Sequence, residues 1–253
     1  MPMHRCLAGG GLLLAALLAA AAAQAQPAAP IGRCQAVSAA TPPTVLELYT
    51  SEGCSSCPPA DRWLSSLRGR ADVLALAFHV SYWDRLGWPD RFALPEATAR
   101  QRELAQRAGS RQVYTPQVVA NGRDWRDWHR EPIPRPPVPS GGAVRLGLQQ
   151  EGLVVRVQVD PWLVRADARF SGYWALLEDS HESQVKAGEN AGATLRHHHV
   201  VRMIQSVPAW LARAGHAGRI EVPAADPRHP RRVVFVVTDE ATSRPVQALA
   251  LAC

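Results

Sequence analysis

Two cysteines separated by two residues, Cys54 and Cys57, lie where a strand-forming segment gives way to a helix-forming one. The preceding segment, TVLELYT (44–50), is rich in apolar and β-favouring residues. The following segment, PPADRWLSSLRGR, opens on Pro58 and Pro59, and proline suits the first helical position because the N–H there has no helical partner. The pattern therefore predicts a strand, a tight loop and a helix in direct succession.

The rest of the first half continues this alternation. Residues 71–83 form a nearly continuous apolar run, which is typical of a strand buried on both faces. Residues 95–109 favour a helix, and residues 113–122 favour a strand that ends at an Asn-Gly turn. The order β-α-β-α-β predicts an α/β domain over residues 44–130.

The composition changes after this region. Residues 131–142, EPIPRPPVPSGG, are proline-rich and predict a stiff linker. Residues 143–253 contain about six short strand-like segments separated by turn-like clusters, with clear alternation of apolar and polar residues in VVRVQVD. This second part is predicted to be a mostly-β, sandwich-like domain.

The N-terminal residues have the features of a targeting signal. A short basic start is followed by an apolar run over 7–23 and by Ala-Gln-Ala at 23–25. This predicts a signal peptide over 1–25, followed by a Pro/Ala-rich leader over 26–43, and a periplasmic or secreted protein. The alternative is an uncleaved membrane anchor, for which the run is short, and no later segment has the ~20 apolar residues of a membrane span.

The net charge of +6 comes almost entirely from arginine, because the chain has a single lysine, Lys186. The arginines are scattered among acidic residues and do not form one basic run. A nucleic-acid or lipid surface is the alternative, but this distribution is typical of a solvated face. We expect no nucleic-acid partner.

Removal of the signal peptide leaves four cysteines, and an even number in an oxidising compartment favours pairing. Cys54 and Cys57 are close enough to pair locally. Cys34 and Cys253 remain, near the two ends of the mature chain, and domain termini often lie close together. We predict a structural Cys34–Cys253 disulfide, with two free thiols as the alternative.

A cysteine pair at the start of a helix suits thiol–disulfide exchange. The thiolate is the attacking species, and a helix N-terminus stabilises it. Cys54 is the predicted nucleophile, and Cys57 is the predicted resolving thiol that releases a protein or small-molecule product. Half of a zinc site and an inert structural disulfide are the alternatives, although no second C-x-x-C completes a zinc site.

Three blocks, LELYTSEGCSSCPPAD, LAFHVSYWDRLGW and VYTPQVVANG, resemble the signature blocks of the secreted bacterial "domain of unknown function 1223" family. The resemblance is dense over residues 45–122 and weaker beyond, in TLRHHHVVR. That family is assigned to the thioredoxin-like superfamily and has no established activity. The resemblance implies an extracytoplasmic setting and a thioredoxin-like fold for the first domain. Such folds place a cis-proline beside the cysteine pair, which makes Thr115 and Pro116 candidate site residues.

Two further residues are candidates for moving protons near the thiols. Glu47 lies in an otherwise apolar strand seven residues before Cys54, and His79 lies in the second buried strand. A copper-binding carrier is a second hypothesis, because the thiolates of Cys54 and Cys57 with the imidazole of His79 would suit copper. Otherwise no cofactor is expected. A third hypothesis is a non-catalytic binding module whose cysteines only brace the fold.

Overall fold

The computed structural model describes residues 34–139 and 141–253, so the predicted signal peptide lies outside the described residues. The helices in these ranges are α1 (Pro58–Ser66), η1 (Ser81–Leu86, 3₁₀), α2 (Pro95–Arg107) and η2 (Ala212–Ala214, 3₁₀). The strands are β1 (Cys34–Val37), β2 (Thr44–Thr50), β3 (Val73–His79), β4 (Gln117–Ala120), β5 (Arg123–Asp124), β6 (Ala143–Glu151), β7 (Val154–Trp162), β8 (Arg169–Glu178), β9 (His181–Gln184), β10 (Thr194–His197), β11 (Val200–Leu211), β12 (His216–Glu221), β13 (Arg231–Asp239) and β14 (Pro245–Leu251).

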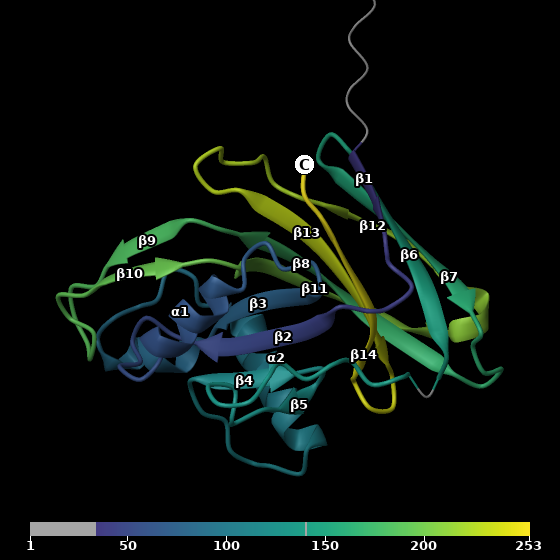
Figure 1. Cartoon of the computed structure of the whole chain (residues 1–253). Coiled ribbons are helices and arrows are strands. Elements are labelled where there is room, and N and C mark those ends of the chain that lie inside the picture. Colours follow the sequence, from purple (N-terminus) through teal and green to yellow (C-terminus); the bar gives the residue numbers. More distant parts are fainter. Residues whose placement is uncertain (1–33, 140) are drawn as a thin grey trace, which may run out of the picture. The chain divides into compact units, whose positions relative to one another are not determined.

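Strands from both halves of the chain share one eight-stranded sheet, in the order β14-β13-β8-β11-β3-β2-β4-β5 (Figure 1). A second sheet has the order β1-β6-β7-β12, and β9 and β10 pair as a separate hairpin. Within the large sheet, β3 runs parallel to both β2 and β11, whereas β2–β4 and β8–β13 are antiparallel pairs.

The expected α/β thioredoxin-like domain, followed by a separate β-sandwich-like domain, is wrong. The structure is mostly β, and its large sheet runs through both halves. The physical reason lies at the edge of β3, whose backbone groups would be unpaired in a separate first domain. There Val200 of β11 pairs with Ala77, and the Ala77 N–H donates to the His199 carbonyl at 2.8 Å.

The large sheet is covered on both faces by apolar packing. On one face, α2 packs against a continuous cluster that includes Tyr49, Phe78 and Val236. On the other face, α1 covers the first-half strands through Leu64 and its neighbours. On that same face, the four-stranded sheet covers the second-half strands through a cluster that includes Trp174. Three apolar clusters therefore bury the sheet, one on the α2 face and two on the opposite face.

Local sequence patterns account for the elements that position the cysteines. β2 and β3 are almost wholly buried, which explains their continuous apolar character. β7 alternates buried and exposed residues, as its sequence predicts. Because β2 and β3 are parallel and Thr50 pairs with His79, the loops that follow both strands emerge at the same edge of the sheet.

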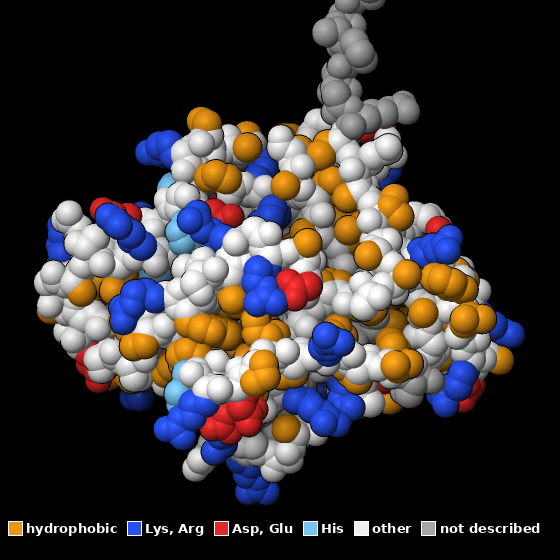
Figure 2. Space-filling view, in the orientation of Figure 1, with side chains coloured by type: hydrophobic (Ala, Val, Ile, Leu, Met, Phe, Trp, Pro, Cys, Tyr) orange, Lys and Arg blue, Asp and Glu red, His pale blue; other side chains and the backbone are white. Residues whose placement is uncertain are grey.

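The surface seen in Figure 2 has Lys and Arg side chains spread among Asp and Glu side chains. None of the helices within residues 34–139 and 141–253 is both long enough and apolar enough to cross a membrane.

The predicted Cys34–Cys253 disulfide is present. It ties β1, an edge strand of the four-stranded sheet, to the residues that follow β14 at the edge of the large sheet. The bond therefore fixes the end of one sheet to the end of the other.

Replacing both Cys34 and Cys253 by serine should lower the free energy of unfolding by about 3–5 kcal/mol, because the bond closes a long loop in the unfolded chain. The loop spans a sequence separation of 219 residues. Urea unfolding of the double variant and the wild type measures the difference. A loss below about 1 kcal/mol would show that the bond contributes little.

Candidate functional site

Cys54 and Cys57 are joined by a disulfide in the loop between β2 and α1. Cys57 is the N-cap residue of α1, and its carbonyl accepts hydrogen bonds from the N–H groups of Ala60 and Asp61. The Cys57 N–H donates to the Cys54 carbonyl at 3.2 Å, which closes a tight turn. Both cysteines are fully buried, with 0% exposure. The sequence therefore placed the pair correctly at a strand-to-helix junction, but its sulfurs are covered.

The segment before β4 lies beside this loop. The Thr115–Pro116 peptide bond is cis. Trp83 Nε1 donates to Thr115 Oγ1 at 2.8 Å. We call residues 51–57, between β2 and α1, the cysteine loop. A Cβ atom added to Gly53 would lie 3.3 Å from Trp83 Cβ, so the cysteine loop packs closely on the same tryptophan. Trp83 thus connects the cis-proline segment to the cysteine loop.

A cavity of about 380 Å³ opens next to Pro116. Its walls include the aromatic side chains of Tyr114, Trp125 and Trp128. Trp125 and Trp128 also pack on Trp63 of α1. The cavity is therefore an aromatic hollow between residues 112–118 and residues 125–128.

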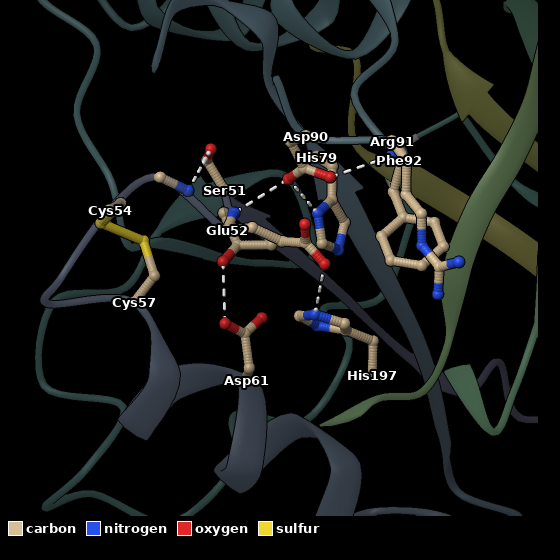
Figure 3. A network of polar contacts seen from close by, with 12 residues as sticks. Ser51, Glu52, Cys54, Cys57, Asp61, His79, Asp90, Arg91, Phe92 and His197 are labelled. Atoms are coloured by element: carbon tan, nitrogen blue, oxygen red, sulfur yellow. Dashed lines mark hydrogen bonds and ion pairs between the residues drawn. A yellow bond between two sulfur atoms is a disulfide. The ribbon is translucent and has the colours of Figure 1, made fainter. Parts of the chain in front are cut away.

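A buried polar network lies to one side of the disulfide (Figure 3). Glu52 has 0% exposure, and its carboxylate accepts hydrogen bonds from Trp88 Nε1 at 2.8 Å and from His197 Nε2 at 3.2 Å. The Glu52 N–H donates to Asp90 Oδ2 at 2.9 Å, and His79 Nδ1 contacts the same oxygen at 2.6 Å. The network joins three elements that are distant in sequence: the cysteine loop, the segment after β3, and β10.

Within this network, His79 and Asp90 each stabilise the charged form of the other. Burial alone would lower the pKa of His79, but the nearby carboxylates, Asp90 foremost, together outweigh burial and the net shift is upward. Burial alone would raise the pKa of Asp90, but the charge and hydrogen bond of His79 outweigh it and the net shift is downward. Both shifts favour the charged forms, an imidazolium beside a carboxylate. His79 Nε2 and His197 Nδ1 are buried and have no hydrogen-bond partner among the described residues.

Asp61 is a site residue that the sequence analysis did not select. It lies one helical turn after Cys57, is buried, and accepts a hydrogen bond from Thr50 Oγ1 at 3.0 Å (Figure 3). Burial raises its pKa, while the nearby imidazoles of His197 and His79 oppose the shift. Its spacing of four residues from Cys57 is visible in the sequence and places both residues on one side of the helix.

The predicted proton-relay residue Glu47 lies elsewhere. It is buried against α2, on the opposite face of the sheet from α1, and forms an ion pair with Arg100 at 2.6 Å. Tyr49 and Tyr173 also donate to its carboxylate. Burial alone would raise the pKa of Glu47, but the Arg100 charge and the hydrogen bonds that the carboxylate accepts together outweigh burial, and the pKa is lowered. Glu47 thus belongs to a separate buried cluster.

The other predicted relay residue, His79, lies within the polar network, where its Nδ1 contacts Asp90. The copper hypothesis placed it with Cys54 and Cys57 as a ligand. In the described part of the chain, no group of three or more His, Cys, Asp or Glu side chains is arranged to hold a metal ion. The two cysteines are bonded to each other.

The neighbouring histidines also separate. His197 ends β10 and contacts Glu52, whereas His199 has a positive φ of 58° and contacts Arg232. The turn between β10 and β11 therefore places the two imidazoles in different surroundings.

Replacing His79 by Gln should remove a pH-dependent part of the protein's stability. Because the pKa of His79 is raised on folding, its stabilisation is present below about pH 6.5 and is lost as the pH rises through the folded pKa. The difference in free energy of unfolding between wild type and His79→Gln, about 1–3 kcal/mol at pH 6, should shrink toward pH 9. Urea unfolding at a series of pH values measures it, and equal pH profiles would contradict the assignment.

Comparison with known proteins supplies the family. The family described as "Protein of unknown function (DUF1223)" matches residues 45–238. No curated protein matches this chain. A crystal structure of a protein from Agrobacterium tumefaciens is similar, with a TM-score of 0.60 and 26% identity, over 83% of this chain and 93% of that one. HBP35 of Porphyromonas gingivalis shares the fold, with a TM-score of 0.52 and 14% identity, over 84% of this chain and 76% of that one. The chain belongs to the DUF1223 family.

Proposed function

We propose that this protein is a thiol–disulfide oxidoreductase that exchanges electrons with thiol or disulfide substrates through Cys54 and Cys57. The observation that carries the proposal is the disulfide at the start of α1, between the cis-proline segment and the buried polar network. A cysteine pair in such a loop can open and close with little change in the rest of the chain, because both cysteines belong to one tight turn.

The reaction balances with a substrate disulfide as the co-reactant. In the reduced protein, the Cys54 thiolate attacks one substrate sulfur, forms a mixed disulfide and releases the other substrate sulfur as a thiolate. The Cys57 thiolate then attacks Cys54 Sγ, which closes the Cys54–Cys57 bond and releases the second substrate thiolate. The substrate gains two electrons, the protein loses two, and the released thiolates take up two protons. A dithiol substrate drives the same steps in reverse.

Asp61 is the side chain we propose to exchange a proton with Cys57. Its raised pKa lets it hold a proton at a higher pH than an exposed aspartate does. Thr50 fixes one of its oxygens, and the helix carries it on the same side as Cys57. The hollow beside Pro116 offers an aromatic surface, with Gln112 and Arg126 at its walls, for the part of a substrate that flanks its reacting sulfur.

We also propose that the protein works outside the cytoplasm, in the periplasm or as a secreted protein. Two disulfides support this, because such bonds persist in oxidising compartments and are rare in the cytosol. The N-terminal signal-like sequence gives the same indication.

A second candidate function follows from the burial of the disulfide. Both cysteines have 0% exposure, and a covered disulfide can simply brace the loop of a binding protein. In that case the pair would stay oxidised during the protein's activity, and mild reductants would not open it.

Exchange activity should depend on Cys54 and Cys57 but not on the other pair. Cys54→Ser should reduce turnover of a disulfide substrate, such as insulin, by at least about 100-fold, because the attacking thiolate is lost. Cys57→Ser should instead accumulate a mixed disulfide at Cys54, visible by mass spectrometry. The Cys34→Ser/Cys253→Ser variant is the matched control and should retain activity at a temperature where it is folded.

Two results would reject the proposal. One is equal turnover by wild type and Cys54→Ser. The other is a Cys54–Cys57 bond that 1,4-dithiols open only when the protein unfolds, which would support the bracing role instead.

A further inference from the structure

The turn that connects β9 to β10, residues 185–193, contacts the cysteine loop directly. Asn190 Nδ2 donates to the carbonyls of Glu52 and Cys54, at 2.8 and 2.9 Å. The Glu189 carboxylate accepts a hydrogen bond from the Ser55 N–H at 3.0 Å. We call residues 185–193 the strap. It reaches the loop from more than 130 residues away in sequence.

The strap is anchored on both sides. At its ends, β9 and β10 pair with each other, and β10 lies beside α1 (Figure 1). Within it, Gly188 packs on Trp88, where a Cβ atom would lie 3.3 Å from Trp88 Cβ. Trp88 in turn donates to the Glu52 carboxylate. The strap is therefore joined to the cysteine loop through side chains of its own and through the polar network.

The strap also changes which hydrogen-bond donors and charges would lie near a Cys54 thiolate. Backbone N–H groups at a helix start ordinarily stabilise a thiolate. Here the first two helical positions are Pro58 and Pro59, which have no N–H, and the Ser55 N–H is bonded to Glu189. The strap thus uses one nearby donor and places a carboxylate beside Cys54.

Charged and titratable groups, Glu189 among them, lie on every element around the Cys54–Cys57 pair. They are Glu52 of the loop, Asp61 and Arg62 of α1, His79 of β3, Asp84 and Asp90 of the segment after β3, and Lys186, Glu189, Arg196 and His197 of the β9–β10 hairpin. Glu189 differs from the other carboxylates because it is exposed and bonds the backbone next to Cys54. Its charge can be removed without opening the buried network.

We propose that Glu189 and Asn190 are positioning residues that hold Cys54 in a covered, weakly nucleophilic state until the strap moves. The inference rests on the proposed exchange reaction and adds a way of regulating the reactivity of Cys54. Asn190 holds the strap over the loop, so that both sulfurs are shielded. Glu189 disfavours negative charge at Cys54 when the pair is reduced. A substrate that displaces the strap exposes the sulfurs and frees the Ser55 N–H.

The effect of the Glu189 charge on the Cys54 thiol is tested by Glu189→Gln in a Cys57→Ser background, with the Cys34–Cys253 bond intact. The pH dependence of iodoacetamide alkylation at Cys54, followed by peptide mass spectrometry, gives the thiol pKa. Loss of one neighbouring carboxylate should lower that pKa and raise the alkylation rate at pH 7 by about three- to tenfold. Glu182→Gln is the matched control, because Glu182 is an exposed carboxylate of the same hairpin that pairs with Arg196.

The role of Asn190 in holding the strap over the cysteine loop is tested by Asn190→Ala in the otherwise unchanged protein. Reduction of the Cys54–Cys57 bond by dithiothreitol should be about three- to tenfold faster, because strap opening then breaks fewer hydrogen bonds. Thermal unfolding of the oxidised variants shows that they are folded.

The outcomes separate this inference from the proposed function. An unchanged Cys54 pKa in Glu189→Gln, or an equal change in Glu182→Gln, overturns the role of Glu189. An unchanged reduction rate in Asn190→Ala overturns the role of the strap as a cover. Neither measurement requires substrate turnover, so an inactive wild type with shifted Cys54 reactivity rejects the exchange reaction and retains the strap.

Discussion

The parallel pairing of β3 with both β2 and β11 is the constraint on which the rest of the structure depends. β2 and β3 bring the cysteine loop and the Asp90 segment to one edge of the sheet, because Thr50 and His79 are paired at their ends. β11 pairs on the other side of β3 at Val200 and thereby brings β10, with His197 at its end, to that same edge. Without this second pairing the Glu52–His197 contact could not form.

The site is consequently built by both halves of the chain. The first half supplies the disulfide and the His79–Asp90 pair. The second half supplies His197 and the strap, whose Asn190 donates to the backbone carbonyl of Cys54. Buried polar groups need partners, and here the partners come from distant segments, so the polar network also fixes how the β9–β10 hairpin lies on the cysteine loop.

Local patterns predicted the elements nearest the cysteines but not their assembly. The apolar runs of β2 and β3 and the two prolines before α1 are features of a few neighbouring residues. The pairing of Val200 with Ala77 joins residues more than 120 positions apart, and nothing in either segment specifies the other. The β9 and β10 strands are short and largely polar, so they give little periodic signal. The proline-rich residues 131–142, in contrast, are a local signal that favours a boundary between two domains.

The same limit applies to the candidate site. The spacing of Cys54 and Cys57 is visible in the sequence, whereas Glu52, Asp90 and His197 look like ordinary surface residues until the fold buries them together. Glu47 lies away from the cysteines because alternation along β2 turns it toward α2, where it pairs with Arg100.

The central claim is that the Cys54–Cys57 bond opens and closes in the folded protein. Equilibrium titration of the wild type in glutathione buffers, with the state of each cysteine read by alkylation and mass spectrometry, tests it most directly. The account predicts a reversible two-electron transition at Cys54–Cys57 above about −300 mV, while Cys34–Cys253 stays oxidised and the circular dichroism spectrum is unchanged. A Cys54–Cys57 bond that persists below that potential, or that opens only as the protein unfolds, would contradict it.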